Sequence, residues 1–211
     1  LVAFRSRVSI GDTFPVGRLG TAPLAGLALV FPLIRLLQMT SAGAMGGGVS
    51  SAVARALGGG NRDAARRLVV HALVIALAGG LAFTFLLLGL GRGLYALLGG
   101  RGGALEQALA YSQVLFGGAV LVWLANTLAS LLRGSGNTLL PSVALSVGSL
   151  VHVPLSGALT LGWGPFPQLG IRGAAFAYLG GFGVSAVLMA LILSRGALRP
   201  RAGDWRLQWS S

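Results

Sequence analysis

Residues 68–90 read LVVHALVIALAGGLAFTFLLLGL, a run of 23 residues without a charged side chain. At about 1.5 Å per residue, a helix of this length reaches about 34 Å, which is enough to cross a hydrocarbon core of about 30 Å. A helix that is apolar on every side is typical of lipid, because a water-soluble helix keeps one polar face. The stretch therefore predicts an integral membrane protein.

The composition of the whole chain agrees with this interpretation. Its mean hydropathy is +0.82, and charged residues make up only 9% of the 211 residues. The net charge of +12 comes from arginines that mostly separate apolar runs, without the basic clusters and interleaved aromatics of a nucleic-acid interface. The absence of cysteine excludes disulfides, thiolate metal sites and cysteine nucleophiles.

Apolar runs of about 20 residues recur along the chain, separated by connectors rich in Gly and Arg. We place membrane spans at 22–53, 68–90, 104–131, 139–163 and 174–194. The first run would be about 48 Å long as a helix, so we expect it to tilt, to protrude from the bilayer or to be shorter than the pattern suggests. The fold class is therefore an all-α bundle of about five to six transmembrane helices.

Arginine is distributed unevenly between the two sides on which the connectors fall. One side has nine arginines, which are Arg55, Arg62, Arg66, Arg67, Arg133, Arg195, Arg199, Arg201 and Arg206. The other side has four, which are Arg18, Arg92, Arg101 and Arg172. Because cytoplasmic loops carry the excess of basic residues, we expect the 55–67 connector, the 133–138 turn and the C-terminal tail to be cytoplasmic.

Four short motifs occur in order along the chain. They are Gly11-Asp12-Thr13 with Val16-Gly17-Arg18-Leu19-Gly20, then Val49 to Asn61, then Arg133-Gly134-Ser135-Gly136-Asn137-Thr138 closed by Pro141, and finally Leu169 to Ala175. Together they resemble the helix junctions of the multidrug and toxic compound extrusion (MATE) transporters. The resemblance covers the chain from residue 11 to about residue 195.

This resemblance implies a twelve-helix transporter of two lobes, with the present chain as its N-terminal lobe. We expect residues 1–20 to hold the truncated end of helix one and the following loop. Residues 21–195 would be helices two to six, and residues 196–211 an Arg-rich cytoplasmic tail or inter-lobe linker. Since residues 1–20 cannot form a span and lack a signal-peptide pattern, we expect a fragment that misses most of helix one and the C-terminal lobe.

The family exports cationic or amphipathic compounds and is driven by the entry of protons or sodium ions. The resemblance therefore implies a drug:proton or drug:sodium antiporter, multi-pass in the inner (plasma) membrane. Its partners would be the lipid bilayer, a drug-like substrate, the coupling ion and the missing C-terminal lobe, with no nucleic acid. Alternatives are a lipid-linked oligosaccharide flippase of the same superfamily, a permease subunit of an ATP-driven transporter, and a membrane scaffold without transport.

Asp12 matches the helix-one aspartate that the resemblance implies as the proton or cation site, and an intramembrane carboxylate is often functional. Alternatively, Asp12 has no role.

The family often has Asn-x-x-x-Asp-Pro in span five, whereas residues 149–154 read SLVHVP, with Val153 in place of the aspartate. His152 is adjacent, and histidine is the side-chain type that can take a proton near neutral pH, but on a helix it points about 100° away from Val153. His152 is either a second coupling group or a packed or interfacial histidine.

Polar residues inside the spans are candidates for a substrate cavity. Asn126 lies three residues after Trp123 and four before Ser130, so the three share one helix face, and Gln113 precedes them in the same run. They could line a cavity or form hydrogen bonds between helices. Arg35 lies in the first span, where it either faces a cavity that favours anionic cargo or snorkels to the interface.

The residues show no enzyme signature. The two histidines are far apart and the four acids are scattered, so we find neither a metal-ligand cluster nor a Ser/His/Asp set. The Gly46-Gly47-Gly48 and Gly58-Gly59-Gly60 runs lack the Lys-Ser/Thr ending of a phosphate loop. We therefore expect no enzymatic activity, no cofactor and no metal.

Overall fold

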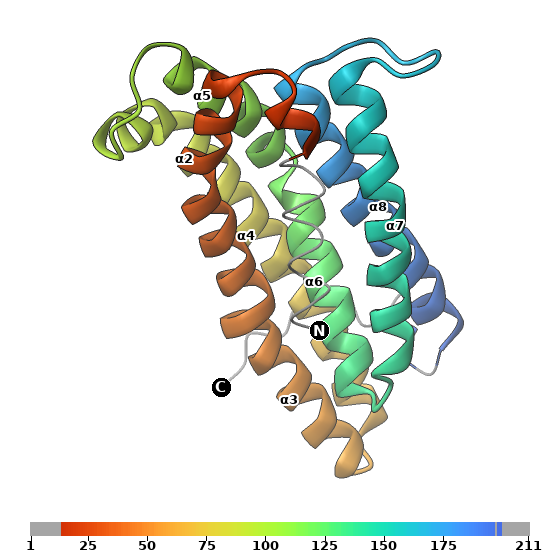
Figure 1. Cartoon of the computed structure of the whole chain (residues 1–211). Coiled ribbons are helices and arrows are strands. Elements are labelled where there is room, and N and C mark those ends of the chain that lie inside the picture. Colours follow the sequence, from red (N-terminus) through yellow and green to blue (C-terminus); the bar gives the residue numbers. More distant parts are fainter. Residues whose placement is uncertain (1–13, 197, 200–211) are drawn as a thin grey trace.

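The computed structural model describes residues 14–196 and 198–199, and every regular element in this part of the chain is a helix (Figure 1). The elements in chain order are α2 (Thr21–Gln38), η1 (Met39–Ala44), α3 (Met45–Gly58), α4 (Arg62–Leu97), α5 (Gly102–Gly117), α6 (Ala119–Gly134), α7 (Leu139–Leu161) and α8 (Ile171–Arg195). The predicted all-α class is confirmed.

Four helices of the described chain are long and apolar enough to cross a membrane, or five if the bent pair α5–α6 is one span. This agrees with the five predicted spans. The first span is longer than expected, because α2, η1 and α3 continue without a break over the 38 residues Thr21–Gly58. The third is not straight, since α5 and α6 meet at 49° at the Gly117-Gly118 pair, where the helix can kink.

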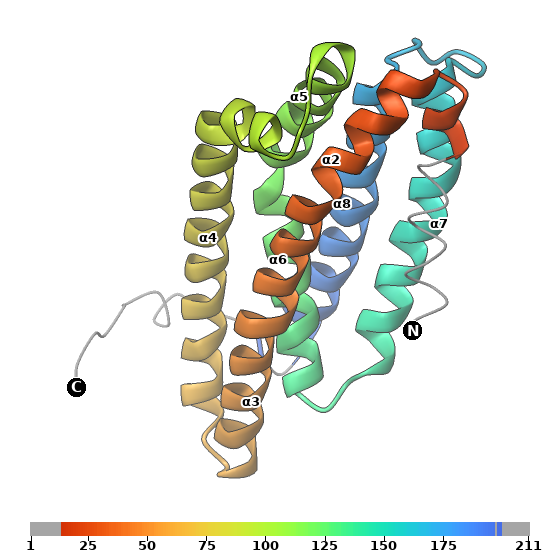
Figure 2. The ribbon, with the colours of Figure 1, turned by 60° about the vertical axis from the view of Figure 1, so that its left-hand side comes forward.

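Helix α6 lies at the centre of the bundle in both ribbon views (Figures 1 and 2). Twelve of its 16 residues are buried, and it packs against α3, α4 and α8. By contrast, α4 presents Ile75, Leu81 and Phe85 to the outside. Bulky exposed apolar side chains are what a lipid-facing surface requires. Polar residues of α6 therefore face neighbouring helices, whereas the outer side of α4 faces lipid.

The α3–α4 and α6–α7 turns, at the lower end of the bundle in Figure 1, have the same local structure. Gly60 and Gly136 both have positive φ, of 75° and 87°. Each is followed by an asparagine that caps the next helix: Asn61 Oδ1 accepts the Ala64 N–H at 2.9 Å, and Asn137 Oδ1 accepts the Leu140 N–H at 2.9 Å. Glycine accepts a left-handed backbone without strain, and asparagine supplies the cap, which explains the Gly-Asn pairs in the sequence.

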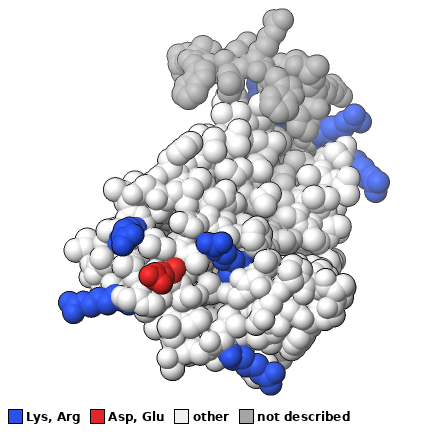
Figure 3. Space-filling model, turned by 90° about the horizontal axis from the view of Figure 1, so that it is seen from above, with Lys and Arg blue, Asp and Glu red and all other residues white. Residues whose placement is uncertain are grey.

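The two ends of the bundle differ in charge. The lower end has the α3–α4 and α6–α7 turns and the end of α8, and the upper end has the α4–α5 and α7–α8 connections (Figures 1 and 2). Figure 3 looks onto the upper end and shows scattered basic side chains on a mostly uncharged surface. Apart from Arg35 within the first span, the described arginines are grouped at the two ends as the sequence predicted, with most of them at the lower end.

Candidate functional site

The middle of the first span is a π-helix, η1. The N–H of Met45 bonds to the carbonyl of Thr40, five residues earlier, instead of the usual four. Buried positions change their spacing here: Leu37 and Ser41 are four apart, but the next buried residue is Gly46. The extra residue keeps the buried face of α3 directed at the bundle. Such local π-helical turns are rare and are frequent at functional sites.

A polar cluster forms around this segment. We use this name for Gln38, Ser41, Asn126, His152 and Tyr178. The amide nitrogen of Asn126 donates to Ser41 Oγ at 2.8 Å and to Gln38 Oε1 at 3.3 Å, and Gln38 Nε2 donates to the Tyr178 hydroxyl at 2.8 Å. The first span, α6 and α8 are thus joined at the middle of the 38-residue first span.

His152 brings α7 to the same cluster. Its side chain is buried, and its ring meets that of Tyr178 edge-on with 5.7 Å between centroids. Tyr178 also packs on Phe182, at 5.0 Å between ring centroids. Val153, the next residue on α7, is exposed. The predicted divergence of His152 and Val153 is therefore present, with the histidine on the inner side.

The polar residues of α6 do not all join the cluster. Ser130 continues toward the lower end, where it accepts a hydrogen bond from Arg133 at 3.0 Å. Trp123 is buried instead against α4, where a Cβ added to Gly79 would lie 2.6 Å from the indole and where Phe83 is 5.8 Å away between centroids. The helix face that these residues were predicted to share is therefore divided between two neighbours, with Trp123 against α4 and Asn126 against the first span.

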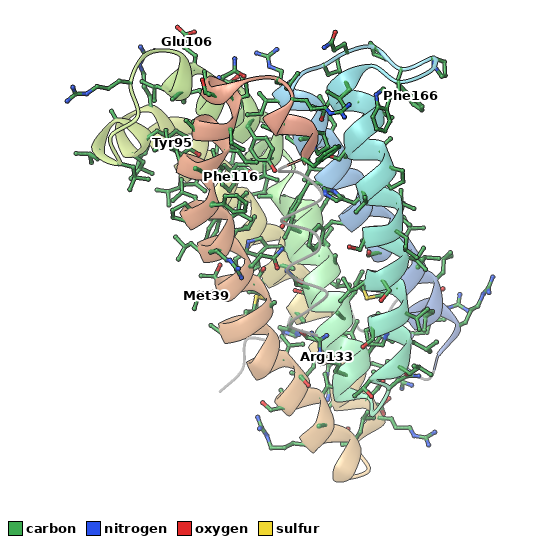
Figure 4. The ribbon with its side chains drawn as sticks, viewed as in Figure 1. Met39, Tyr95, Glu106, Phe116, Arg133 and Phe166 are labelled. Carbon is green, nitrogen blue, oxygen red and sulfur yellow. The ribbon has the colours of Figure 1, made fainter. Side chains whose placement is uncertain are left out.

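Three other predicted residues lie apart from the cluster or outside the described chain. Gln113 is exposed on α5, and Arg35 is exposed on α2. Asp12 lies outside the described residues. In Figure 4, Met39, the residue after Gln38, points away from the bundle on the α2 side. Glu106 lies at the upper end of the bundle and Arg133 near the lower end.

Comparisons with known proteins identify the family. The MatE family model matches residues 2–157, which is more than half of the chain. The chain belongs to the MatE family.

Curated relatives of this MatE chain include a transporter and a probable multidrug resistance protein. An FAD transporter of Shewanella oneidensis is 31% identical over 212 residues, covering 96% of this chain and 46% of that protein. A probable multidrug resistance protein NorM of Thermotoga maritima is 28% identical, covering 96% of this chain and 44% of that protein. The MatE chain therefore spans about half the length of these relatives.

Solved MATE structures have the same fold. An inward-facing multidrug resistance MATE transporter of the MOP superfamily matches with a TM-score of 0.89 at 28% identity, over 96% of this chain and 46% of that one. A MOP superfamily transporter from Pyrococcus furiosus, whose structure is described as having a binding pocket of reverse polarity, matches with a TM-score of 0.88 at 27% identity, over 99% of this chain and 46% of that one. The resemblance read from the four motifs is confirmed, and the chain is a multi-pass membrane chain of the MatE family.

Three members of the cluster in this MatE chain were not predicted as site residues: Gln38, Ser41 and Tyr178. The sequence contained a signal for the first two, because Gln38 is a lone amide within an apolar run and Ser41 follows it by three residues. Tyr178 had no such signal, since a tyrosine in a membrane helix is most often an interface anchor.

The described part of this MatE cluster lacks a carboxylate. Among residues 14–196 and 198–199 the acids are Asp63, in the first turn of α4, and Glu106, exposed near the start of α5. Asp63 pairs with Arg66 at the lower end. No group of three or more metal-binding side chains occurs in this part of the chain. The described cluster therefore provides hydroxyls, amides and one imidazole for binding.

Proposed function

We propose that this chain forms one half of a secondary active transporter that exports amphipathic organic compounds across the cytoplasmic membrane in exchange for protons or sodium ions. The observation that carries the proposal is the buried polar cluster at the middle of the first span, where four helices meet. Polar residues at this depth are costly in lipid and mark transport pathways. Transporters of this kind bind substrate and ion near the membrane midplane.

The outer surface of η1 and α3 supports a role beside a second half. Apart from Arg55 in the last turn of α3, its exposed residues are small, and they include Gly43, Gly47, Gly48, Ser51 and Ala54. No large apolar side chain is exposed between Thr40 and Gly58, in contrast to α4. Small residues let another helix approach closely, whereas lipid favours bulky ones. We infer that this face meets the second helical half of the transporter, against which alternating access would operate.

We propose Asp12 and His152 as the cation-coupling residues, with Asp12 as the main one. In sequence, Asp12 matches the aspartate that the family has in its first helix. His152 supports the assignment because it is the one titratable imidazole that contacts the cluster within the described residues. A histidine can change its charge in the physiological range, so it could take a proton during the cycle.

Asn126 is the best supported substrate-contacting residue, because it organises the cluster through two hydrogen bonds. We keep Gln113, Trp123, Ser130 and Arg35 as further candidates for the substrate pathway. Trp123 and Ser130 lie on the same helix as Asn126, one turn to each side of it. Gln113 and Arg35 are exposed and would act only from a cavity shared with the second half.

A second candidate function is the export of flavin nucleotides. It is favoured by the name of the 31% identical relative, an FAD transporter, together with the lack of a carboxylate in the described cluster. A flavin nucleotide carries phosphates and ring carbonyls, which do not need a negative partner. The match to the MatE family model favours either candidate over the oligosaccharide flippase and over the permease of an ATP-driven transporter.

The test uses the protein as its own cell makes it, purified and placed in lipid vesicles. We expect an imposed proton or sodium gradient to drive the movement of ethidium or FAD, followed by fluorescence. Asn126→Leu should slow this movement, whereas Ser142→Ala should not, because Ser142 is exposed and bonds only to the Thr138 carbonyl in its own turn. Absence of movement under both gradients would contradict the proposed function.

A further inference from the structure

The start of α4 carries positive charge that the described residues do not balance. Its first residues read RDAARR, from Arg62 to Arg67, and Asp63 is the acid of the first turn. Asp63 pairs with Arg66. Arg62 and Arg67 are exposed, and neither forms an ion pair with another described residue. Two unpaired guanidinium groups are therefore displayed at the lower end of the bundle.

The stability of α4 does not account for these two arginines. A helix dipole favours basic side chains in the last turn and disfavours them in the first. Arg55, Arg133 and Arg195 occupy the last turns of α3, α6 and α8, where the dipole supports them. The dipole of α4 disfavours Arg62 in its first turn and gives Arg67, one turn later, no support. A negatively charged partner would offset this disadvantage.

Arg67 shares one face of α4 with the large apolar side chains that face lipid. At 3.6 residues per turn, Val74, Leu81 and Phe85 lie within about 40° of Arg67 around the helix axis. All three are exposed, and Phe85 is exposed by 74%. Helix α4 packs against α3, α5 and α6 and lies at the edge of the bundle in Figure 2. Arg67 is therefore in line with an apolar strip on the outer side of the protein.

His71 lies one turn beyond Arg67 on this face and is partly exposed. Its Nδ1 atom is 2.8 Å from the Arg67 carbonyl oxygen, and a carbonyl can only accept, so Nδ1 donates this bond. The next polar side chain on α4 is Thr84, whose hydroxyl is turned inward to donate to the Phe116 carbonyl at 2.6 Å. The face thus begins with a charged group and an imidazole and continues as apolar surface, the order of a phospholipid from head group to chains.

The length of this face places Arg67 among lipid head groups. Arg92 is exposed near the other end of α4, within about 20° of Arg67 around the axis. At about 1.5 Å per residue, the rise from Arg67 to Arg92 is about 38 Å. The hydrocarbon core of a bilayer is about 30 Å thick, and about 40–45 Å with its head-group layers. The two arginines therefore reach opposite head-group layers, with the apolar strip between them.

We propose that Arg62 and Arg67 bind the phosphate of an anionic phospholipid, in the leaflet at the lower end of the bundle. The chains of this lipid lie along Val74, Leu81 and Phe85. Guanidinium groups suit a phosphate because they offer paired N–H donors to its oxygens. A zwitterionic lipid binds less well, since its head group brings a cation to a surface that is already positive. A free phosphate leaves the apolar strip uncovered. This lipid site lies outside the polar cluster and does not depend on the transport function proposed above.

The experiment titrates the protein, purified in detergent as its own cell makes it, with dioleoyl phosphatidylglycerol or dioleoyl phosphatidylcholine, and measures bound lipid by native mass spectrometry. We expect tighter binding of phosphatidylglycerol. Arg67→Gln should weaken it about fivefold, and Arg62→Gln combined with Arg67→Gln by more than about tenfold, the scale of one and two basic residues at a membrane surface. Phosphatidylcholine binding should change by less than about twofold.

Arg195→Gln is the matched control, because it removes one exposed arginine from the same end of the bundle. It lies on α8, which α6 separates from α4 in both ribbon views (Figures 1 and 2). It should weaken phosphatidylglycerol binding by no more than about twofold. An equal loss in Arg195→Gln and Arg67→Gln would show an effect of total charge and overturn the site. Displacement of phosphatidylglycerol by millimolar inorganic phosphate would overturn the lipid as the partner and assign a free anion instead.

Discussion

Gly148 on α7 and Gly181 on α8 bring these two helices into backbone contact, because a Cβ added to Gly181 would lie 2.7 Å from the carbonyl oxygen of Gly148. Ser185 strengthens the contact by donating to the Ala144 carbonyl across the interface at 3.1 Å. In lipid there is little hydrophobic drive for helices to associate, so this close packing has to hold α7 against α8. The position of His152 beside Tyr178 depends on it.

Gly181→Ala should destabilise the protein. The added methyl group must push α8 away from α7, which we estimate to cost about 1–3 kcal/mol. The matched control is Gly183→Ala on the same helix, where nothing lies within 4 Å of an added Cβ. Because alanine favours a helix over glycine by up to about 1 kcal/mol, this control should leave stability unchanged or raise it. Thermal unfolding in detergent would measure both, and equal melting temperatures would contradict the contact.

Asn126→Leu should lower stability through the loss of its bonds to Ser41 and Gln38. Hydrogen bonds between membrane helices contribute about 0.6 kcal/mol on average and up to about 1.7 kcal/mol. We expect a loss in this range, measured by unfolding followed with near-ultraviolet circular dichroism. Ser142→Ala should stay within about 0.5 kcal/mol, as most exposed substitutions do. A stable Asn126→Leu variant with an unchanged near-ultraviolet spectrum would mean that the amide does not organise the cluster.

The sequence predicted the spans well because lipid imposes one strong rule: a helix must stay apolar over about 20 residues. It made Asn126 a candidate for a cavity or for hydrogen bonds between helices, since polar groups in such helices avoid lipid, but it left open whether His152 is packed or interfacial. It did not predict that Trp123 would turn to Gly79, because helix spacing alone does not say which neighbour each side of a central helix meets. The hydrogen bond between Gln38 and Tyr178 could not be predicted from the sequence either, because 140 positions separate the two residues.

The topology can be tested in this cysteine-free chain by single-cysteine labelling. We expect Ser135→Cys, in the α6–α7 turn, to react only from the cytoplasm, and Gln168→Cys, in the α7–α8 connection, only from outside. Both positions are exposed, and the larger arginine count lies at the Ser135 end. If an impermeant reagent added to intact cells labelled Ser135→Cys, the topology would be the reverse of the one expected.

The 211 residues expressed by themselves should not transport. Alternating access needs two halves that move about a central site, and this chain matches about 46% of the length of the solved transporters. Cells that make only these residues should retain ethidium as strongly as cells with an empty vector. Energy-dependent efflux from such cells would show that one half is sufficient.

The coupling assignment predicts unequal effects of two substitutions. In the protein as its cell makes it, Asp12→Asn should abolish or strongly impair gradient-driven export, because it removes the main protonatable group. His152→Ala should leave most of the export, since the histidine is a secondary group. Initial rates at several imposed pH gradients would measure this. Loss of export in His152→Ala together with normal export in Asp12→Asn would assign the coupling to the histidine.

The π-helix η1 has a consequence for how related sequences are compared. An added or lost residue in an ordinary membrane helix turns every side chain beyond it by about 100°, so such changes are usually rejected. In η1 one surplus residue is absorbed between Leu37 and Gly46, and both flanking helices keep their buried sides. A relative that lacks this residue could run as a plain α-helix here with the same neighbours. Alignments of the family should therefore allow a one-residue gap inside this span, where gaps are normally forbidden.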